Sequence, residues 1–458
     1  MSAALELVAV AVLGLVGLVV IDRALLRRDL PWLIVAGGVV VREVVQPLPR
    51  LEVGGIAVYP EDVVTVLVGV VLAAWLLRGA ALRTPQLLVC LALALVGISI
   101  ARGAAQFGLP AAINEARETL YFLGGVLLGS FAPVDAAGRA RLARGWLVVA
   151  GGLVVLAVIR WGIVVFDIPL RGGWYIPDFG GLRVLYASGS LAIAIAYLIV
   201  LPRLVTGRAG WADRLMALAF AGTVVVLQHR SVWAVALLGT AATVVWLRHA
   251  LDRRVVAVVV VGGVLLSIAA LTTLDTGALV ARASETDAAD SNTWEWRTSG
   301  WADLIATASR QSGPVEVLLG LPYGTGWLRS VSAGFDVTVP PHNFYLEIGL
   351  RIGVLGLGLV VAPVAWAVRR LARRLGEDGA APLAAGTLLV ITLVCATYGV
   401  PYNLQTEQGL LIGLAIAVAC ATSGTARGIV LVPPASADGA VGDPVEGLRG
   451  AEGRVDVG

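Results

Sequence analysis

The sequence predicts an all-α, polytopic integral membrane protein with about 12 or 13 transmembrane helices and one long external loop that contains a surface helix. Of the 458 residues, 58% are hydrophobic and only 14% are charged, and the mean hydropathy is +0.87. A soluble domain is roughly 45–50% apolar and about 25% charged. A large soluble α/β enzyme, the alternative, has no core large enough to hide this excess, so a bilayer must cover part of it.

Apolar stretches long enough to cross a bilayer, or nearly so, recur along the chain. They lie at about 5–21, 31–45, 62–77, 85–101, 113–131, 146–166, 183–201, 212–228, 231–247, 255–274, 343–367, 382–400 and 407–424. The stretch 31–45 is the weakest, because it contains Arg42 and Glu43 and ends in a Pro-rich segment. A partial or re-entrant helix is the alternative there, and this choice decides between 12 and 13 spans.

Arginine supplies every basic side chain, and its clusters predict the orientation. They are Arg23/Arg27/Arg28, Arg78/Arg83, Arg139/Arg141/Arg144, Arg203/Arg208/Arg214, Arg248/Arg253/Arg254 and Arg369/Arg370/Arg373/Arg374. Two spans separate each cluster from the next, so all of them can face the cytoplasm. With 13 spans the N-terminus is outside, and the first stretch is expected to be an anchor rather than a cleaved signal peptide. Clusters divided by apolar spans form no continuous basic face, which argues against a nucleic-acid partner.

Two regions lie outside the regular pattern of spans and short loops. The transmembrane domain covers 1–424, and the tail 425–458, rich in Gly, Ala, Pro and acidic residues, is predicted to be a disordered cytoplasmic extension. The long external loop covers about 275–342.

This loop contains start and stop signals for one helix. Asn292 and Glu295 resemble a capping box, and Arg310, Gly313 and Pro314 form a helix end. Tryptophans recur at helical spacing in between, which predicts an amphipathic helix along the membrane surface. We expect the following segment, Gly320–Gly326, to be a flexible turn.

His342 is the candidate general base among three histidines. It follows Pro340-Pro341 at the start of the next span, whereas His229 lies in an external turn and His249 in a cytoplasmic Arg cluster. The positive end of a helix lowers the pKa of a histidine, and neutral imidazole can accept a proton. Such a helix start also attracts phosphate. A purely structural interfacial histidine is the alternative.

Several arginines are predicted to lie outside the membrane but close to it. Arg230 lies in a very short turn, Arg297 is one helical turn from Trp294 and Trp301, and Arg171 lies in a loop with Trp174. Arg160 lies toward the outer end of an apolar span, where a charge needs a partner or a substrate. Interfacial snorkelling is the alternative for each. As a set they suit bidentate binding of phosphate groups, as in a lipid diphosphate at the membrane surface.

Other charged residues have plainer explanations. Glu347 and Arg351 are spaced for an ion pair within one helix. Glu61-Asp62 is expected to mark a helix start, with a metal site as the alternative. The cysteines Cys90, Cys395 and Cys420 lie in apolar stretches, as small core residues do. No metal-binding or cofactor-binding motif is present, so we expect no metal and no cofactor.

The stretch 223–366 resembles the O-antigen ligase and polymerase superfamily of bacterial membrane glycosyltransferases. His342-Asn343, then nine residues, then Gly353 and the small Gly356 fit the family's His-Asn signature. Arg230-Ser231 resembles the family's Ser-Arg-Ser turn, although Gln228-His229 replaces the usual small residues before the arginine. Arg297, in Trp-Arg-x-x-x-Trp, matches the family's external arginine.

This resemblance implies glycan transfer from an undecaprenyl-diphosphate-linked oligosaccharide to a glycan or other hydroxyl acceptor, at the outer face of the cytoplasmic membrane. His342 would activate the acceptor, Arg230 and Arg297 would hold the diphosphate, and Arg171, Arg160 and Asn343 are further candidates for substrate contact. The reaction would be inverting and metal-independent, and membrane lipid would surround the protein. Ligase and polymerase share these residues, so that choice stays open. A transporter or flippase of lipid-linked glycans is the alternative, which predicts inverted repeats and broken helices. An inactive protein of the same fold is a third alternative.

Overall fold

The chain is described by a computed structural model that covers residues 30–44, 51–53, 56–77, 81–132, 134–166, 183–252, 295–310, 312–331, 336–376 and 381–421. The helices in these ranges are α2 (Leu30–Val44), α3 (Pro60–Leu77), α4 (Thr84–Phe107), α5 (Leu109–Ser130), α6 (Ala136–Val165), α7 (Ala187–Val205), α8 (Trp211–Val226), α9 (Arg230–Leu247), α12 (Pro314–Leu319), α13 (Phe344–Arg373), the 3-10 turn η1 (Arg374–Gly376), α14 (Ala381–Tyr398) and α15 (Thr406–Ala421). Residues 295–310 are also helical.

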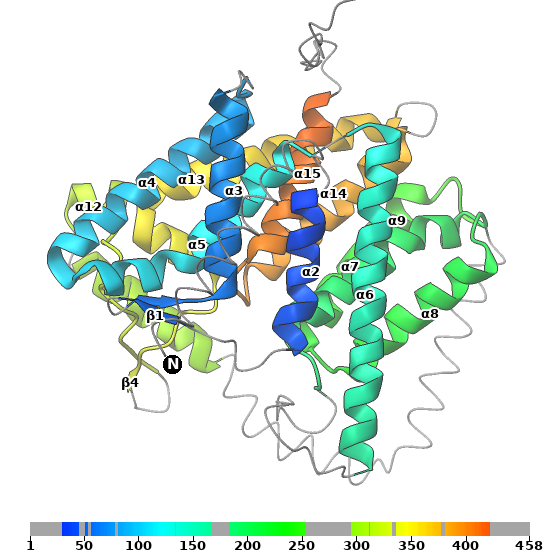
Figure 1. Ribbon diagram of the computed structural model, residues 1–458, viewed down its shortest axis with the longest axis horizontal. Coiled ribbons are helices and arrows are strands. Elements are labelled where there is room, and N and C mark those ends of the chain that lie inside the picture. Colours follow the sequence, from blue (N-terminus) through cyan, green and yellow to red (C-terminus); the bar gives the residue numbers. More distant parts are fainter. Residues whose placement is uncertain are drawn as a thin grey trace, which may run out of the picture.

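Strand is scarce in the described ranges and is confined to connections. Strands β1 (Leu51–Val53) and β2 (Ile56–Val58) form one antiparallel hairpin before α3, and β3 (Arg329–Ser330) and β4 (Asp336–Val337) form another before α13. Figure 1 shows β1 and β4 near one edge of the helical body. The all-α fold class is therefore confirmed for the part of the chain that the structure describes.

Each predicted apolar stretch that falls within the described ranges forms a helix. Six of these helices, α3, α4, α6, α7, α9 and α13, are long and apolar enough to cross a membrane. The predicted stretches 5–21 and 255–274, the tail 425–458 and the cap residue Asn292 lie outside the described residues. The helix predicted in the long external loop is present at 295–310.

The weak stretch 31–45 is helical as α2, and its two charges have partners. Arg42 forms an ion pair with Glu407 of α15 at 2.6 Å, and Glu43 is buried opposite Arg160 of α6 at 3.7 Å. Because each charge is neutralised by another helix, α2 can lie inside the fold despite them. Pairing of this kind depends on residues far apart in the sequence, which is why the stretch looks weak in isolation.

Helices α5 and α15 pack with their backbones in contact, which places the middle of α5 beside the segment that precedes α15. Each has two glycines one turn apart: Gly125 and Gly129 in α5, and Gly409 and Gly413 in α15. A Cβ atom at any of them would collide with the backbone of the other helix. Small residues at this spacing allow close helix packing of the kind seen in membrane proteins.

Helix α13 is broken at Gly353, where φ is 69° and ψ is −175°. The break frees carbonyl groups of the preceding turn from the regular helical pattern. The Leu350 carbonyl accepts from the Leu321 backbone N–H at 2.7 Å, and the Arg351 carbonyl accepts from the Ser99 hydroxyl at 2.8 Å. The external loop is thus docked directly onto the break.

Substituting Gly353 by alanine is expected to destabilise the protein by roughly 2–6 kcal/mol, because the positive φ disfavours a side chain and the new Cβ would collide with the Leu318 carbonyl. The measurement is thermal unfolding of the purified, detergent-solubilised chain. The matched control is Gly358→Ala in the same helix, where a Cβ meets nothing within 4 Å. Equal stability of the two variants would show that the break carries no strain.

Candidate functional site

The segment that leads into α13 is held in one conformation by its neighbours. His342 has a positive φ of 51°, which is unusual for a residue with a side chain. Before it, the Pro341 carbonyl accepts from the Trp301 ring N–H at 2.6 Å. After it, the Asn343 side chain caps α13 by accepting from the Leu346 N–H at 3.0 Å. The predicted helix start is confirmed, and Asn343 acts in it as the N-cap.

Arg297 is one of two cations beside His342. It lies on the helical segment 295–310, donates to the Pro401 carbonyl at 3.3 Å, and places its guanidinium 5.4 Å from the ring centre of Tyr402. Its Nε is buried without a hydrogen-bond partner. The structure thus brings Arg297 close enough to His342 for its charge to act on the imidazole.

Arg329 is the second cation, and the sequence interpretation missed it. Only 2% of it is exposed, and it donates to the carbonyls of Trp327, Val339 and Pro340. Its guanidinium lies 5.5 Å from a ring of Trp296, and its Nε has no hydrogen-bond partner. Arg329 thus supports the two residues before Pro341 and adds a buried positive charge beside His342. Its one sequence signal, an arginine after Trp327 in an external loop, is not distinctive.

The environment of His342 keeps its imidazole neutral. Burial and the positive charges of Arg297 and Arg329 lower the pKa of His342 from 6.5 to about 4. The sequence also predicts a lowered pKa for His342, but it attributes the shift to the positive end of the helix. In the structure, burial and the two arginines cause it. A neutral imidazole beside two guanidinium groups can accept a proton while an anion is held nearby.

Arg230, the first residue of α9, lies toward the same end of the helices. Helices α9 and α14 run antiparallel, with Trp246 packed against Gly386 and Gly239 against Val394. Arg230 is nine residues before Gly239, and Asn403 is nine residues after Val394. Because α14 ends at Tyr398, this antiparallel register places the start of α9 toward the C-terminal end of α14, which leads into the segment that Arg297 contacts. Arg230 itself is exposed.

The side chains of Arg160 and His229 both bond to other residues of the protein. Arg160 is 1% exposed, donates to the Val184 carbonyl at 2.8 Å and pairs with Glu43. The prediction that it needs a partner is confirmed, and this partner is a residue of the protein. His229 contacts the Leu185 carbonyl at 2.8 Å through Nε2. Arg171 lies outside the described residues.

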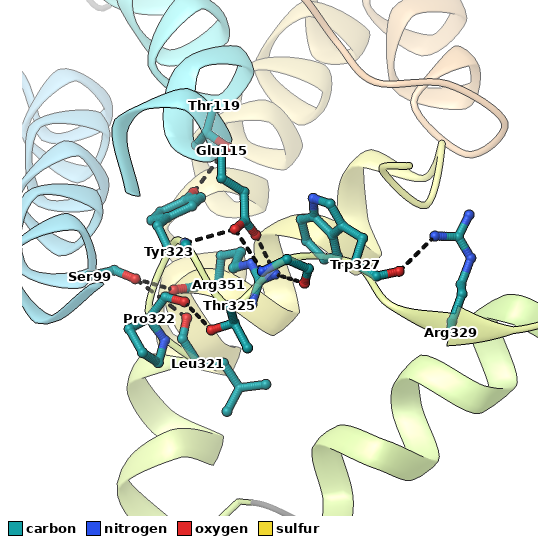
Figure 2. A network of polar contacts seen from close by, with 12 residues as sticks. Ser99, Glu115, Thr119, Leu321, Pro322, Tyr323, Thr325, Trp327, Arg329 and Arg351 are labelled. Carbon is teal, nitrogen blue, oxygen red and sulfur yellow. Dashed lines mark hydrogen bonds and ion pairs between the residues drawn. The ribbon is translucent and has the colours of Figure 1, made fainter. Parts of the chain in front are cut away.

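Figure 2 shows a polar network that anchors the external loop beside this site. Arg351 of α13 forms an ion pair with Glu115 of α5, and its guanidinium lies 3.9 Å from the ring centre of Trp327. Glu115 also accepts from the backbone N–H groups of Gly324 and Gly326 at 2.7 and 3.1 Å. The expected ion pair of Arg351 with Glu347 was wrong, because its partner comes from another helix. The expected flexible turn at Gly320–Gly326 is likewise tied down by side chains.

The network continues from this ion pair toward His342. The Tyr323 hydroxyl donates to Thr119 at 3.1 Å, which fixes the middle of the turn against α5. Trp327 stacks on Arg351 through its ring, and its carbonyl accepts from Arg329 at 3.3 Å. A continuous set of contacts therefore joins α5, α13 and the cation beside His342 (Figure 2).

A carboxylate pair lies close to the same segment and was also missed. Asn403 donates to Glu118 of α5 and lies within hydrogen-bonding reach of Glu347 of α13. Glu347 is buried, and its Oε2 has no hydrogen-bond partner. The described residues contain no group of three or more His, Cys, Asp or Glu side chains that is arranged to hold a metal ion. Glu61 and Asp62 lie in the first turn of α3, which confirms the helix-start interpretation.

Known proteins provide no family assignment for this chain. No protein-family model matches it, and no curated protein matches it either.

Proposed function

We propose that this protein is a membrane glycosyltransferase of the O-antigen ligase-like or polysaccharide polymerase-like kind. It transfers a glycan from an undecaprenyl-diphosphate-linked donor to a hydroxyl acceptor at the extracytoplasmic face of the cytoplasmic membrane. The observation that carries the proposal is a half-buried His342, kept neutral beside the positive charges of Arg297 and Arg329. The six long apolar helices support a location in a membrane.

In this proposal His342 acts as the general base. It takes the proton of the acceptor hydroxyl while the acceptor oxygen forms a bond to the anomeric carbon of the donor sugar. The bond from that carbon to the diphosphate oxygen breaks on the opposite side, so the configuration inverts. Arg230 and Arg297 bind the departing diphosphate and stabilise its negative charge, so the reaction needs no metal ion.

Single replacement of His342, Arg230 or Arg297 by alanine is expected to lower transfer by about 10²–10⁴-fold, the range for loss of a general base or of an oxyanion-binding group. The measurement is the amount of lipid-linked glycan and of surface polymer in cells that carry each variant. Arg310→Ala, an exposed arginine of the same helical segment as Arg297, is the control and is expected to be normal. A normal amount of surface polymer in all three variants would contradict the proposal.

The same experiment separates ligase from polymerase. A polymer ladder that collapses to single repeats indicates a polymerase, whereas full-length chains left on the lipid indicate a ligase. A flippase is the second candidate, favoured by the broken helix α13 and by the charged groups buried beside it, since transporters use such helices. Donor trapped on the inner face of the membrane in the variants would indicate the flippase.

A further inference from the structure

A cavity of about 230 Å³ lies between α6, α7, α14 and α15. Its wall contains Leu142, Trp146, Leu388, Ile391 and Leu411, all of them buried. Two arginines, Arg139 and Arg203, also line it. The cavity thus combines an apolar floor with a basic rim, at the helix ends where the sequence has clusters of arginine.

This cavity is separate from the candidate site around His342. Its wall includes Leu383, near the start of α14. The other end of α14 leads to Gly399, whose carbonyl accepts a hydrogen bond of 2.9 Å from the Phe344 N–H. Phe344 lies next to the candidate site. The sixteen residues from Leu383 to Gly399 correspond to roughly 24 Å of helix. The cavity therefore lies at the opposite end of the helices.

Trp146 and Thr387, the polar side chains of the cavity floor, use their donors inside the protein. The Trp146 ring N–H donates to the Ala192 carbonyl at 3.0 Å, and the Thr387 hydroxyl donates to the Leu383 carbonyl at 2.8 Å. Because these donors are used inside the protein, whatever fills the floor must be apolar. Its volume suits part of one hydrocarbon chain rather than a whole lipid.

The rim offers positive charge at the edge of the apolar floor. Arg139 lies in the first turn of α6 and donates to the Val134 carbonyl, which uses part of its five-donor guanidinium. Arg203 lies in the last turn of α7, with 60% of its side chain exposed, and is 3.5 Å from Asp213. An exposed pair of this kind contributes little, so a phosphate can compete with Asp213 for Arg203.

We propose that this cavity binds one acyl chain of an anionic membrane phospholipid, whose phosphate lies against Arg139 and Arg203. The apolar floor selects the hydrocarbon, and two neighbouring guanidinium groups favour a headgroup with net negative charge over a zwitterionic one. The proposal is independent of the proposed glycan transfer, because the cavity and the candidate site lie at opposite ends of the helices.

The test is native mass spectrometry of the full chain with phosphatidylglycerol or phosphatidylcholine. We expect the wild-type protein to retain phosphatidylglycerol at least tenfold better than phosphatidylcholine, roughly 1.4 kcal/mol of preference. The double variant Arg139→Gln/Arg203→Gln is expected to lose that preference. Arg144→Gln, which removes an exposed arginine of the same helix outside the cavity wall, is expected to keep it.

A second variant tests the apolar part of the site without changing charge. Ala384→Phe fills the cavity from α14, and we expect it to abolish retention of phosphatidylglycerol while thermal unfolding stays within a few degrees of wild type. Equal retention of the two lipids by the wild-type protein would overturn the proposal. So would loss of the preference in Arg144→Gln, since that result would indicate general attraction to a basic surface.

Discussion

Replacing Arg351 by methionine is expected to cost about 3–5 kcal/mol of stability, the penalty for leaving the partner of a buried ion pair uncompensated. Arg351 is only 2% exposed, and its loss leaves the carboxylates of Glu115 and Glu347 without a neighbouring cation. It also removes the stacking on Trp327, so the external loop loses one of its main anchors. Thermal unfolding of the solubilised protein measures the effect.

The stabilities of several variants distinguish the loss of the ion pair from a simple loss of packing around Arg351. Glu115→Gln is expected to cost less, because an amide still accepts from Gly324 and Gly326 and Arg351 keeps Glu347 nearby. The double variant Arg351→Met/Glu115→Gln is expected to recover part of the loss, since one of the uncompensated charges is gone. Arg310→Met serves as the exposed control. An Arg351→Met protein as stable as this control would contradict the role of the pair.

Replacing Arg329 by methionine is expected to move the titration of His342 to higher pH by roughly one unit, because a positive neighbour is removed. In the wild-type protein the pKa of His342 is about 4, against an ordinary value of 6.5. The imidazole is therefore neutral from neutral pH down to about pH 5, and transfer that depends on it should fall only near pH 4. In Arg329→Met, transfer should begin to fall at a higher pH than in the wild-type protein.

Stability provides a readout of the same titration that needs no substrate. The folded state binds the proton of His342 less readily than the unfolded chain, so this group removes stability as pH falls from about 6.5 through about 4. The loss is measured as the difference in unfolding temperature between each protein and its His342→Gln counterpart across this pH range. Arg329→Lys keeps the charge and is expected to behave like wild type in this respect. An unchanged profile in Arg329→Met would show that Arg329 acts on the loop alone.

The sequence predicts the helices well because their signals are local. Apolar length marks α4, α6 and α7, and Pro340-Pro341 marks the start of α13. His342 and Arg297 were singled out by a motif and by aromatic neighbours, and the structure brings these two together.

The remaining parts of the site depend on contacts between distant segments. Glu115 is 236 positions from Arg351, so the spacing rule for helical pairs selected Glu347 instead. Arg329 has no cap, repeat or aromatic spacing around it that distinguishes it from other loop arginines. Its importance arises from burial and from three backbone carbonyls that converge on it. Such convergence is a property of tertiary structure, which local patterns do not encode.

The break at Gly353 also fixes where the external loop docks along α13. The helical residues of α13 before the break, Phe344 to Ile352, form about 2.5 turns at about 3.6 residues per turn, so the freed carbonyls that receive the loop keep a fixed direction relative to the start of α13. One residue inserted between them would rotate these carbonyls by about 100° around α13. The loop that carries Arg329 would then dock on the wrong side of the helix, although every contacting residue would still be present. Chain length in this segment is therefore under tighter constraint than the identity of its apolar residues.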